Sequence, residues 1–182
     1  MPDVFVVSGV QAAGKSTVAD LLAKRYPRGV HVAGDGIRAM VVSGRVDMSQ
    51  EAVPEAARQL KLRYRASIAV ARLYHEANFD VVIEDVIIGP MFDEFLSLIP
   101  WPQAHVVVLD PDLEEVARRE RERTKSAYGA SWSISALQRI LREQTPRLGL
   151  WLDTSRLTPD ETVDAILADP AASCVDLRTL TR

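Results

Sequence analysis

The feature that most constrains how this chain folds is a glycine-rich stretch close to its N-terminus. The residues are Gly9-Val10-Gln11-Ala12-Ala13-Gly14-Lys15-Ser16, followed by Thr17. They fit the spacing G-x-x-x-x-G-K-S/T, in which the glycines let successive backbone N–H groups approach an anion closely. A helix that opens near Gly14 adds the positive end of its dipole, and Lys15 adds a full positive charge. We therefore expect a site for nucleotide phosphates made by Gly9, Gln11, Ala12, Ala13, Gly14, Lys15, Ser16 and Thr17.

The residues on either side of this stretch supply the strand and the helix that such a loop joins. Residues 4–7 form a β-branched, apolar run typical of a buried strand. Apolar residues continue at helical spacing from Val18, and Tyr26-Pro27 ends that helix. This order favours binding of a nucleoside triphosphate over a chance glycine turn. In such a loop Lys15 contacts the β- and γ-phosphates, and the Ser16 hydroxyl ligates Mg²⁺.

The composition limits the classes of protein to which the chain can belong. With 182 residues, 47% of them hydrophobic and 26% charged, the chain is long enough for one globular domain with a substantial core. The net charge of −3 argues against a broad nucleic-acid-binding surface. The single cysteine, Cys174, excludes an intrachain disulfide and suits a reducing compartment. The sequence shows no signal peptide and no run of roughly 20 apolar residues, so we expect a soluble cytoplasmic protein without nucleic-acid or membrane partners.

Strands and helices alternate along the rest of the chain. Further apolar strands are predicted at 30–33, 81–88, 104–109 and 148–153, and a long helix at 54–77 begins with Pro54. Other helix starts are indicated by Asp110-Pro111, by Ser135-Ala136-Leu137-Gln138 and by Thr158-Pro159-Asp160-Glu161. This alternation predicts a three-layer α/β/α domain with a five-stranded parallel sheet.

Asp35 follows the predicted second strand. Ligands of open parallel sheets bind outside the carboxyl ends of the strands, so Asp35 is expected beside the phosphate loop, where it can act as a base. The alternative is that Asp35 caps a helix starting at Gly36, and the two roles are compatible. Arg38, one turn later, either contacts a substrate anion or is solvated.

Two adjacent acids, Glu84 and Asp85, interrupt the apolar run at 81–88. A buried carboxylate needs a partner because leaving it unpaired costs several kcal/mol. Mg²⁺ bound to the phosphate loop is one such partner, so both acids are candidate metal ligands with Ser16. Side chains alternate along a strand, so only one of the two can point at the metal, and we favour Asp85.

The segment 117–125 alternates Arg and Glu and leads into small residues at 126–131. Such alternation usually means an exposed, salt-bridged helix. Near a bound triphosphate, however, a hinged arginine segment can close as a mobile lid. We therefore expect Arg119 and Arg123, with Lys125, to stabilise the charge on a phosphoryl group in transfer.

Together these motifs resemble the P-loop kinases of small molecules and nucleotides, and within that group chloramphenicol phosphotransferase-like proteins. The resemblance runs to about residue 168. It implies a P-loop NTPase fold of the nucleotide-kinase type over 1–168, with a lid at about 118–132 and a C-terminal tail at 169–182.

The resemblance also assigns roles to particular residues. An Asp after the second strand activates the substrate hydroxyl in that family, which matches Asp35, and its acid pair ending the third strand is similar to Glu84-Asp85. The lid pattern Arg-Glu followed by Arg is similar to Arg119-Glu120 and Arg123. The chain departs from the family in having Thr124-Lys125-Ser126 where a further Arg follows, and in having Glu where two aspartates are usual. These departures bear on the substrate more than on the chemistry.

The sequence thus predicts a kinase that uses ATP and Mg²⁺ to phosphorylate a hydroxyl of an antibiotic-like molecule or metabolite, with Asp35, Lys15, Arg119 and Arg123 as catalytic residues and Asp35 and Arg38 binding the acceptor. A nucleotide or adenylylsulfate-type kinase is the alternative, because Gly34-Asp35-Gly36-Ile37-Arg38 resembles the Gly-Asp-x-x-Arg of adenylylsulfate kinases. A P-loop ATPase or switch module is a further alternative. A GTPase is not expected, since the chain's one Asn, Asn78, lies outside any Asn-Lys-x-Asp motif. The acceptor and the oligomeric state are not predicted.

Overall fold

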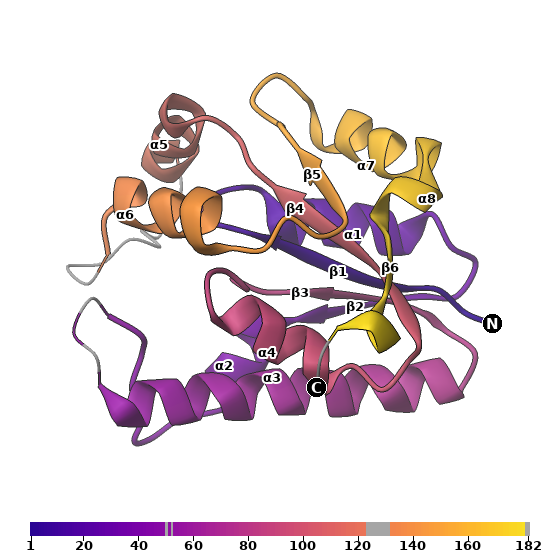
Figure 1. Cartoon of the computed structure of the whole chain (residues 1–182), viewed down its shortest axis with the longest axis horizontal. Coiled ribbons are helices and arrows are strands. Elements are labelled where there is room, and N and C mark those ends of the chain that lie inside the picture. The colour runs from indigo at the N-terminus through magenta and orange to yellow at the C-terminus, as the bar shows by residue number, and fades with distance from the viewer. Residues whose placement is uncertain (50, 52, 123–131, 181–182) are drawn as a thin grey trace.

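The computed structural model describes residues 1–49, 51, 53–122 and 132–180. Its parallel strands are β1 (Val4–Gly9), β2 (Gly29–Ala33), β3 (Asp80–Glu84), β4 (Gln103–Leu109) and β5 (Leu150–Leu152). They form a sheet in the order β2-β3-β1-β4-β5 (Figure 1). β1 lies in the middle and is buried along its whole length, as its continuous apolar sequence predicts. The predicted α/β architecture with a five-stranded parallel sheet is therefore confirmed.

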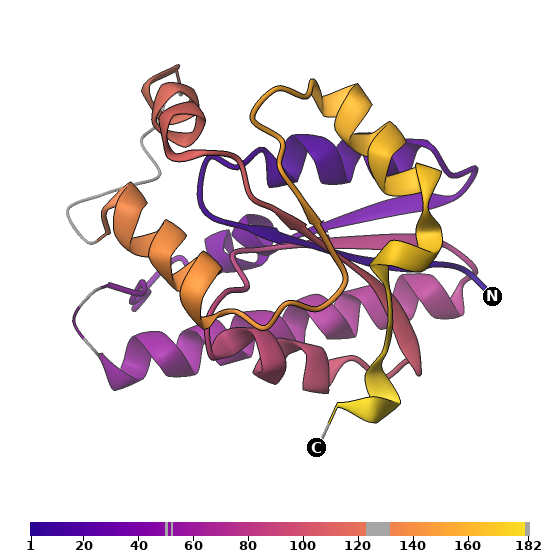
Figure 2. The same cartoon turned by 45° about the horizontal axis from the view of Figure 1, so that its top comes forward.

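Helices cover both faces of this sheet (Figure 1 and Figure 2). One face carries α1 (Lys15–Lys24), α7 (Pro159–Ala168) and α8 (Pro170–Ser173), and the other carries α3 (Pro54–Glu76) and α4 (Met91–Leu98). The short helix α2 (Gly34–Ala39) follows β2 directly. Helix α5 (Leu113–Glu122) and helix α6 (Ile134–Arg139), which continues as a π-helix at Ile140–Gln144, lie at the carboxyl end of the sheet. Among the described residues, no helix is long and apolar enough to cross a membrane.

Tyr64 fixes the long helix α3 to the sheet and to α4. Its ring meets Phe95 of α4 edge to face, with the ring centroids 5.0 Å apart, and both side chains are fully buried. The Tyr64 hydroxyl donates to Val86 O at 3.0 Å. This contact sets the distance between α3 and the segment that follows β3.

The prediction of a strand over 81–88 is wrong beyond Glu84, because side chains take over the bonds that a strand would make. Asp85 Oδ1 accepts from Val86 N at 2.7 Å. Ser8 Oγ accepts from Ile87 N and donates to Ile87 O, at 3.2 and 2.6 Å. Ile87 and Ile88 lie in a loop and are nevertheless buried, so the apolar residues at the end of the 81–88 run indicate burial and not a strand.

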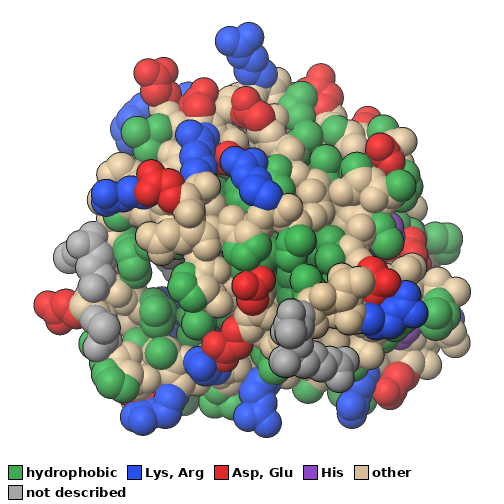
Figure 3. Space-filling model, viewed as in Figure 1, with side chains coloured by type: hydrophobic (Ala, Val, Ile, Leu, Met, Phe, Trp, Pro, Cys, Tyr) green, Lys and Arg blue, Asp and Glu red, His purple; other side chains and the backbone are tan. Residues whose placement is uncertain are grey.

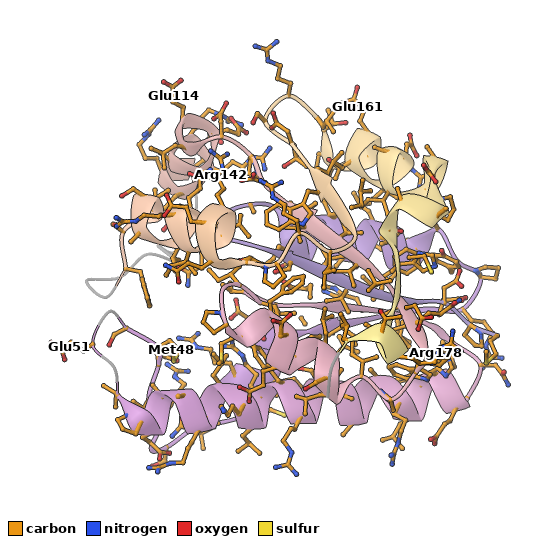
Figure 4. The ribbon with its side chains drawn as sticks, in the orientation of Figure 1. Met48, Glu51, Glu114, Arg142, Glu161 and Arg178 are labelled. Carbon is orange, nitrogen blue, oxygen red and sulfur yellow. The ribbon has the colours of Figure 1, made fainter. Side chains whose placement is uncertain are left out.

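The predicted caps of α5 and α6 are also wrong. Helix α5 begins at Leu113, and Asp112 caps it by accepting from Glu115 N at 2.7 Å. Asp110 instead accepts from Arg142 Nε at 2.9 Å, and Arg142 is labelled in Figure 4. Ser133 caps α6, since its side chain accepts from Ala136 N, whereas Ser135 lies inside the helix.

The start of α2 differs from the prediction as well. The helix begins at Gly34 with Ala33 as its N-cap, so Asp35 does not cap a helix at Gly36. Asp35 lies in the first turn, where a negative charge is favourable. The predicted capping box of α7 is confirmed by reciprocal bonds between Thr158 and Glu161.

The C-terminal residues add a strand that the sequence pattern did not predict. β6 (Cys174–Asp176) runs antiparallel to the amino-terminal part of β4, and a 3₁₀ turn (Leu177–Thr179) follows it. Three residues are too few for a recognisable alternation of apolar and polar side chains. Cys174 is exposed and forms no disulfide among the described residues.

Candidate functional site

The loop between β1 and α1 has the backbone geometry that its sequence predicts. Gly9 has a φ of 148°, and a Cβ there would lie 2.6 Å from Leu109 O. Gly14 has a φ of 97° and precedes the first residue of α1, and Ala12 also has a positive φ of 62°. A side chain disfavours such angles, so the conformation is one that the glycines make accessible. Lys15 Nζ donates to Val10 O at 2.9 Å, across the mouth of the loop.

Glu84, at the end of β3, contacts the loop directly. Its Oε1 accepts from Ser16 Oγ at 3.0 Å and lies 3.8 Å from His31 Nε2 on β2. Burial would raise the pKa of Glu84, but His31, Lys15 and the Ser16 hydroxyl outweigh it and hold that pKa below its usual value. The carboxylate and the Ser16 hydroxyl thus lie together at the loop, and oxygen atoms of these kinds are ligands that Mg²⁺ accepts.

Asp85 points to the other side and pairs with Arg63 of α3. Arg63 Nη2 donates to Asp85 Oδ1 at 2.8 Å, and Asp85 Oδ2 is buried against Gly34, with no hydrogen-bond partner among the described residues. Burial raises the pKa of Asp85 to about 6, although the Arg63 guanidinium acts against this rise. The sequence favoured Asp85 over Glu84 as the acid that points at the metal, and in the structure it is Glu84 that contacts Ser16.

Asp35 and Arg38 belong to α2, which follows the carboxyl end of β2. Asp35 is exposed, and Arg38 is half-buried. Arg38 binds Asp47 through two bonds, Nε to Oδ1 at 2.7 Å and Nη2 to Oδ2 at 2.6 Å. This pair holds the pKa of Asp47 below its usual value despite partial burial. The sequence left open whether Arg38 is solvated or meets an anion, and the structure pairs it with an acid of the same chain.

One cavity of about 1260 Å³ brings these residues together. It opens at the carboxyl end of the sheet, where the surface in Figure 3 is hollowed on the left. Its walls come from the phosphate loop, α2, the loop before α3, α3, the segment after β3 and the start of α6. The predicted site residues that line it are Gln11, Ala12, Gly14, Lys15, Ser16, Thr17, Asp35, Arg38, Glu84, Asp85 and Arg119.

Arg119 reaches the site from α5 and is bound to the outside of the phosphate loop. Its Nη1 donates to Ala13 O at 2.9 Å, its Nη2 to Thr154 O at 2.8 Å, and its Nε to Glu115. Arg118 pairs with Glu115 and Glu122, so α5 is the salt-bridged helix that the alternation of charges also allowed. Arg123 and Lys125, the other expected lid cations, lie outside the described residues.

Several residues that line the cavity were not anticipated, among them Arg63, Asp47 and Trp132. The sequence pointed to Arg63 only indirectly: a buried acid such as Asp85 requires a cationic partner, but the sequence does not show which cation it is. Trp132 donates from Nε1 to Met48 O at 3.0 Å and so bridges the cavity mouth. Met48 is labelled in Figure 4, in the loop before α3. Asp47 and Trp132 belong to segments without periodic pattern, and nothing local marks them.

Solved structures share this fold over nearly the whole chain. An unliganded sugar kinase from Janibacter sp. HTCC2649 has a TM-score of 0.67 at 19% identity, covering 95% of this chain and 96% of that chain. The tunicamycin resistance protein of Deinococcus radiodurans has a TM-score of 0.67 at 14% identity, covering 96% and 99%. The APS kinase of Mycobacterium tuberculosis, in complex with AMPPNP and APS, has a TM-score of 0.64 at 16% identity, covering 92% and 96%.

Sequence comparison gives the family. No curated protein matches the chain. A family model described as an AAA domain matches residues 4–146, from the first residue of β1 to just beyond the π-helix. This region contains the phosphate loop, both acids after it and the long helix α3. The chain therefore belongs to the AAA domain family and has the P-loop NTPase fold.

Proposed function

We propose that the protein is an ATP-dependent phosphotransferase that moves the γ-phosphoryl group to a hydroxyl of a small molecule. One observation carries the proposal: the phosphate loop and Asp35 line the same cavity, whose volume of about 1260 Å³ leaves room for an acceptor beside a triphosphate. The structural neighbours include kinases of sugars and of APS, which is consistent with an acceptor in the remaining space. An ATPase or switch module would need no such space.

The nucleotide end of the cavity fits a triphosphate with its metal. Gly14 has a left-handed backbone and a Cβ at Gly9 would clash with Leu109 O of β4, so the glycines permit the turn that leads into the N-terminus of α1. Lys15 would bind the β- and γ-phosphates, and Ser16 with Glu84 would hold Mg²⁺, with Asp85 second in preference. Bound Mg²⁺ neutralises charge on the phosphate oxygens.

Asp35 is proposed to orient the acceptor hydroxyl and to take its proton. Its carboxylate is exposed to the cavity at the carboxyl end of β2, so an acceptor can reach it. Arg38 lies one turn away on the same wall. Phosphoryl transfer demands mostly positioning and charge stabilisation, and the rigid start of α2 supplies the positioning.

Arg119 is proposed to act from the loop side. Its bonds to Ala13 O and Thr154 O fix the guanidinium beside the phosphate loop without any movement of α5. It would therefore support the bound nucleotide, while Arg123 and Lys125 remain the proposed mobile cations.

The test is a mass-spectrometric screen of alcohol-bearing antibiotics, sugars and nucleosides for ATP-dependent gain of one phosphate. The variant Asp35→Asn should keep ATP binding and lose transfer by about two orders of magnitude or more. Asp93→Asn is the matched control, because Asp93 is another exposed acid in the first turn of a helix, outside the cavity. ATP hydrolysis that no acceptor stimulates, unchanged in Asp35→Asn, would identify an ATPase instead.

A further inference from the structure

We call acceptor half the part of the cavity lined by α2, the loop before α3, α3, the segment after β3 and Trp132; its arginines pair with acids. Arg38 makes two bonds to Asp47, and Arg45 Nε lies 3.6 Å from Asp47 Oδ2. Arg63 pairs with Asp85 at 2.8 Å. With Asp35 and Glu55, the described residues of this half provide three arginines and four carboxylates, so their formal charges leave no excess of positive charge.

The Arg38–Asp47 pair is part of an anchored loop rather than a loose surface contact. Gln59 of α3 binds this loop at both ends of its side-chain amide, with Oε1 accepting from Val46 N and Nε2 donating to Gly44 O, each at 2.9 Å. Trp132 binds Met48 O from the opposite wall. Isolated exposed ion pairs are weak because two side chains must be ordered, but here the backbone that carries Asp47 is already held.

The remaining walls of this half are apolar. They include Ile37, Val41, Leu60, Ile88, Met91 and Trp132. Leu60 and Ile88 are buried in the protein, so they present fixed apolar surface to the cavity. An acceptor that covers these walls loses water from its own apolar surface, which favours binding.

From this arrangement we propose that the acceptor is an uncharged hydroxyl compound with an apolar face, and that Asp47 is the residue that excludes anionic acceptors. The proposal rests on the proposed kinase function and names its substrate class. An anion entering this half would lose its hydration, find Arg38 and Arg63 already bound to acids, and lie close to Asp35, Asp47 and Asp85. A neutral hydroxyl compound meets no such cost.

The test uses three probes of one size that differ in charge: 1-phenyl-1,2-ethanediol, mandelate and 2-amino-1-phenylethanol. Dissociation constants are measured by ligand-observed NMR on the full chain with AMPPNP bound. The wild-type protein should bind the diol about tenfold more tightly than mandelate. Asp47→Asn should reduce that preference about tenfold, because Arg38 loses its carboxylate, and Arg38→Gln should instead improve binding of the amine.

Asp164→Asn is the matched control, since it removes an exposed acid that pairs with Arg25 outside the cavity. It should leave the order of the three probes unchanged. The proposal is overturned if mandelate binds the wild type as well as the diol does, if the diol does not bind, or if Asp47→Asn keeps the wild-type preference. A protein with the expected selectivity that phosphorylates none of the probes or screened alcohols contradicts the kinase proposal and leaves this one standing.

Discussion

The substitution Gly34→Ala tests how closely α2 fits against Asp85. A Cβ at position 34 would lie 2.2 Å from Asp85 Oδ2 and 2.3 Å from its Cγ, far inside van der Waals contact. The backbone of Gly34 is not in the left-handed region, so alanine is acceptable there on conformational grounds. Any destabilisation must therefore come from the displaced carboxylate.

The magnitude follows from what Asp85 would lose. Moving it stretches its bonds to Arg63 Nη2 at 2.8 Å and to Val86 N at 2.7 Å, in a site where the Asp85 side chain is 5% exposed. Breaking a buried ion pair costs about 3–5 kcal/mol, and the helix preference of alanine offsets about 1 kcal/mol. The free energy of unfolding, measured with urea, should fall by about 2–4 kcal/mol.

Gly36→Ala is the control within the same helix, because a Cβ there meets nothing within 4 Å. It should raise the free energy of unfolding by up to about 1 kcal/mol. In a background with Asp85→Ala, which removes the clashing Cγ and Oδ2, Gly34→Ala should cost less than about 1 kcal/mol. Equal losses from Gly34→Ala in both backgrounds would refute the reasoning, as would a change as mild as that of Gly36→Ala.

Three further predictions concern other contacts. Burial raises the pKa of Asp85 from 3.8 to about 6, so its contribution to stability is present below about pH 4 and is lost as the pH rises to about 6, a difference of about 3 kcal/mol. Asp85→Asn should flatten that part of the stability–pH curve, and an unchanged curve would contradict the assignment. Glu84→Gln should weaken ATP binding about tenfold or more in calorimetry with Mg²⁺ and leave binding in EDTA nearly unchanged. Trp132→Phe, which removes the bond to Met48 O, should raise the KM of an identified acceptor about fivefold without affecting the KM of ATP. Trp101→Phe, which removes a donor to His75 away from the cavity, should change neither.

The parts of the site that sequence predicted best are those encoded by adjacent residues. The phosphate loop needs two glycines, a lysine and a serine at fixed spacing, and the strand before it and helix after it are visible in the same 25 residues. Asp35 could be placed because a residue that follows a parallel strand must lie at the carboxyl edge of the sheet. These inferences require no knowledge of how distant segments pack.

The partners of Glu84 and Asp85 could not be predicted in this way, because they depend on how distant segments of the chain pack. A buried acid needs a partner, so a partner for each acid could be predicted. The chain has many cations, however, and only the packing of α3 against the sheet determines that Arg63 is the one that pairs with Asp85. The alternation of side chains predicted opposite directions for the two acids. It could not predict which direction faces the phosphate loop, because that depends on how β3 pairs with β1, with Glu84 beside Val7.

The two ends of the cavity differ in the ligand charge that they favour, and this difference bears on where each proposed substrate would bind. At the nucleotide end, backbone N–H groups, the dipole of α1 and Lys15 favour a highly charged anion. At the acceptor end, each of Arg38 and Arg63 is bound to an aspartate. If the proposed function holds, a triphosphate is favoured at one end and disfavoured at the other, so ATP would not compete with the proposed acceptor for its site. Pairing the arginines with acids of the same chain would then keep the proposed hydroxyl site open when the nucleotide concentration is high.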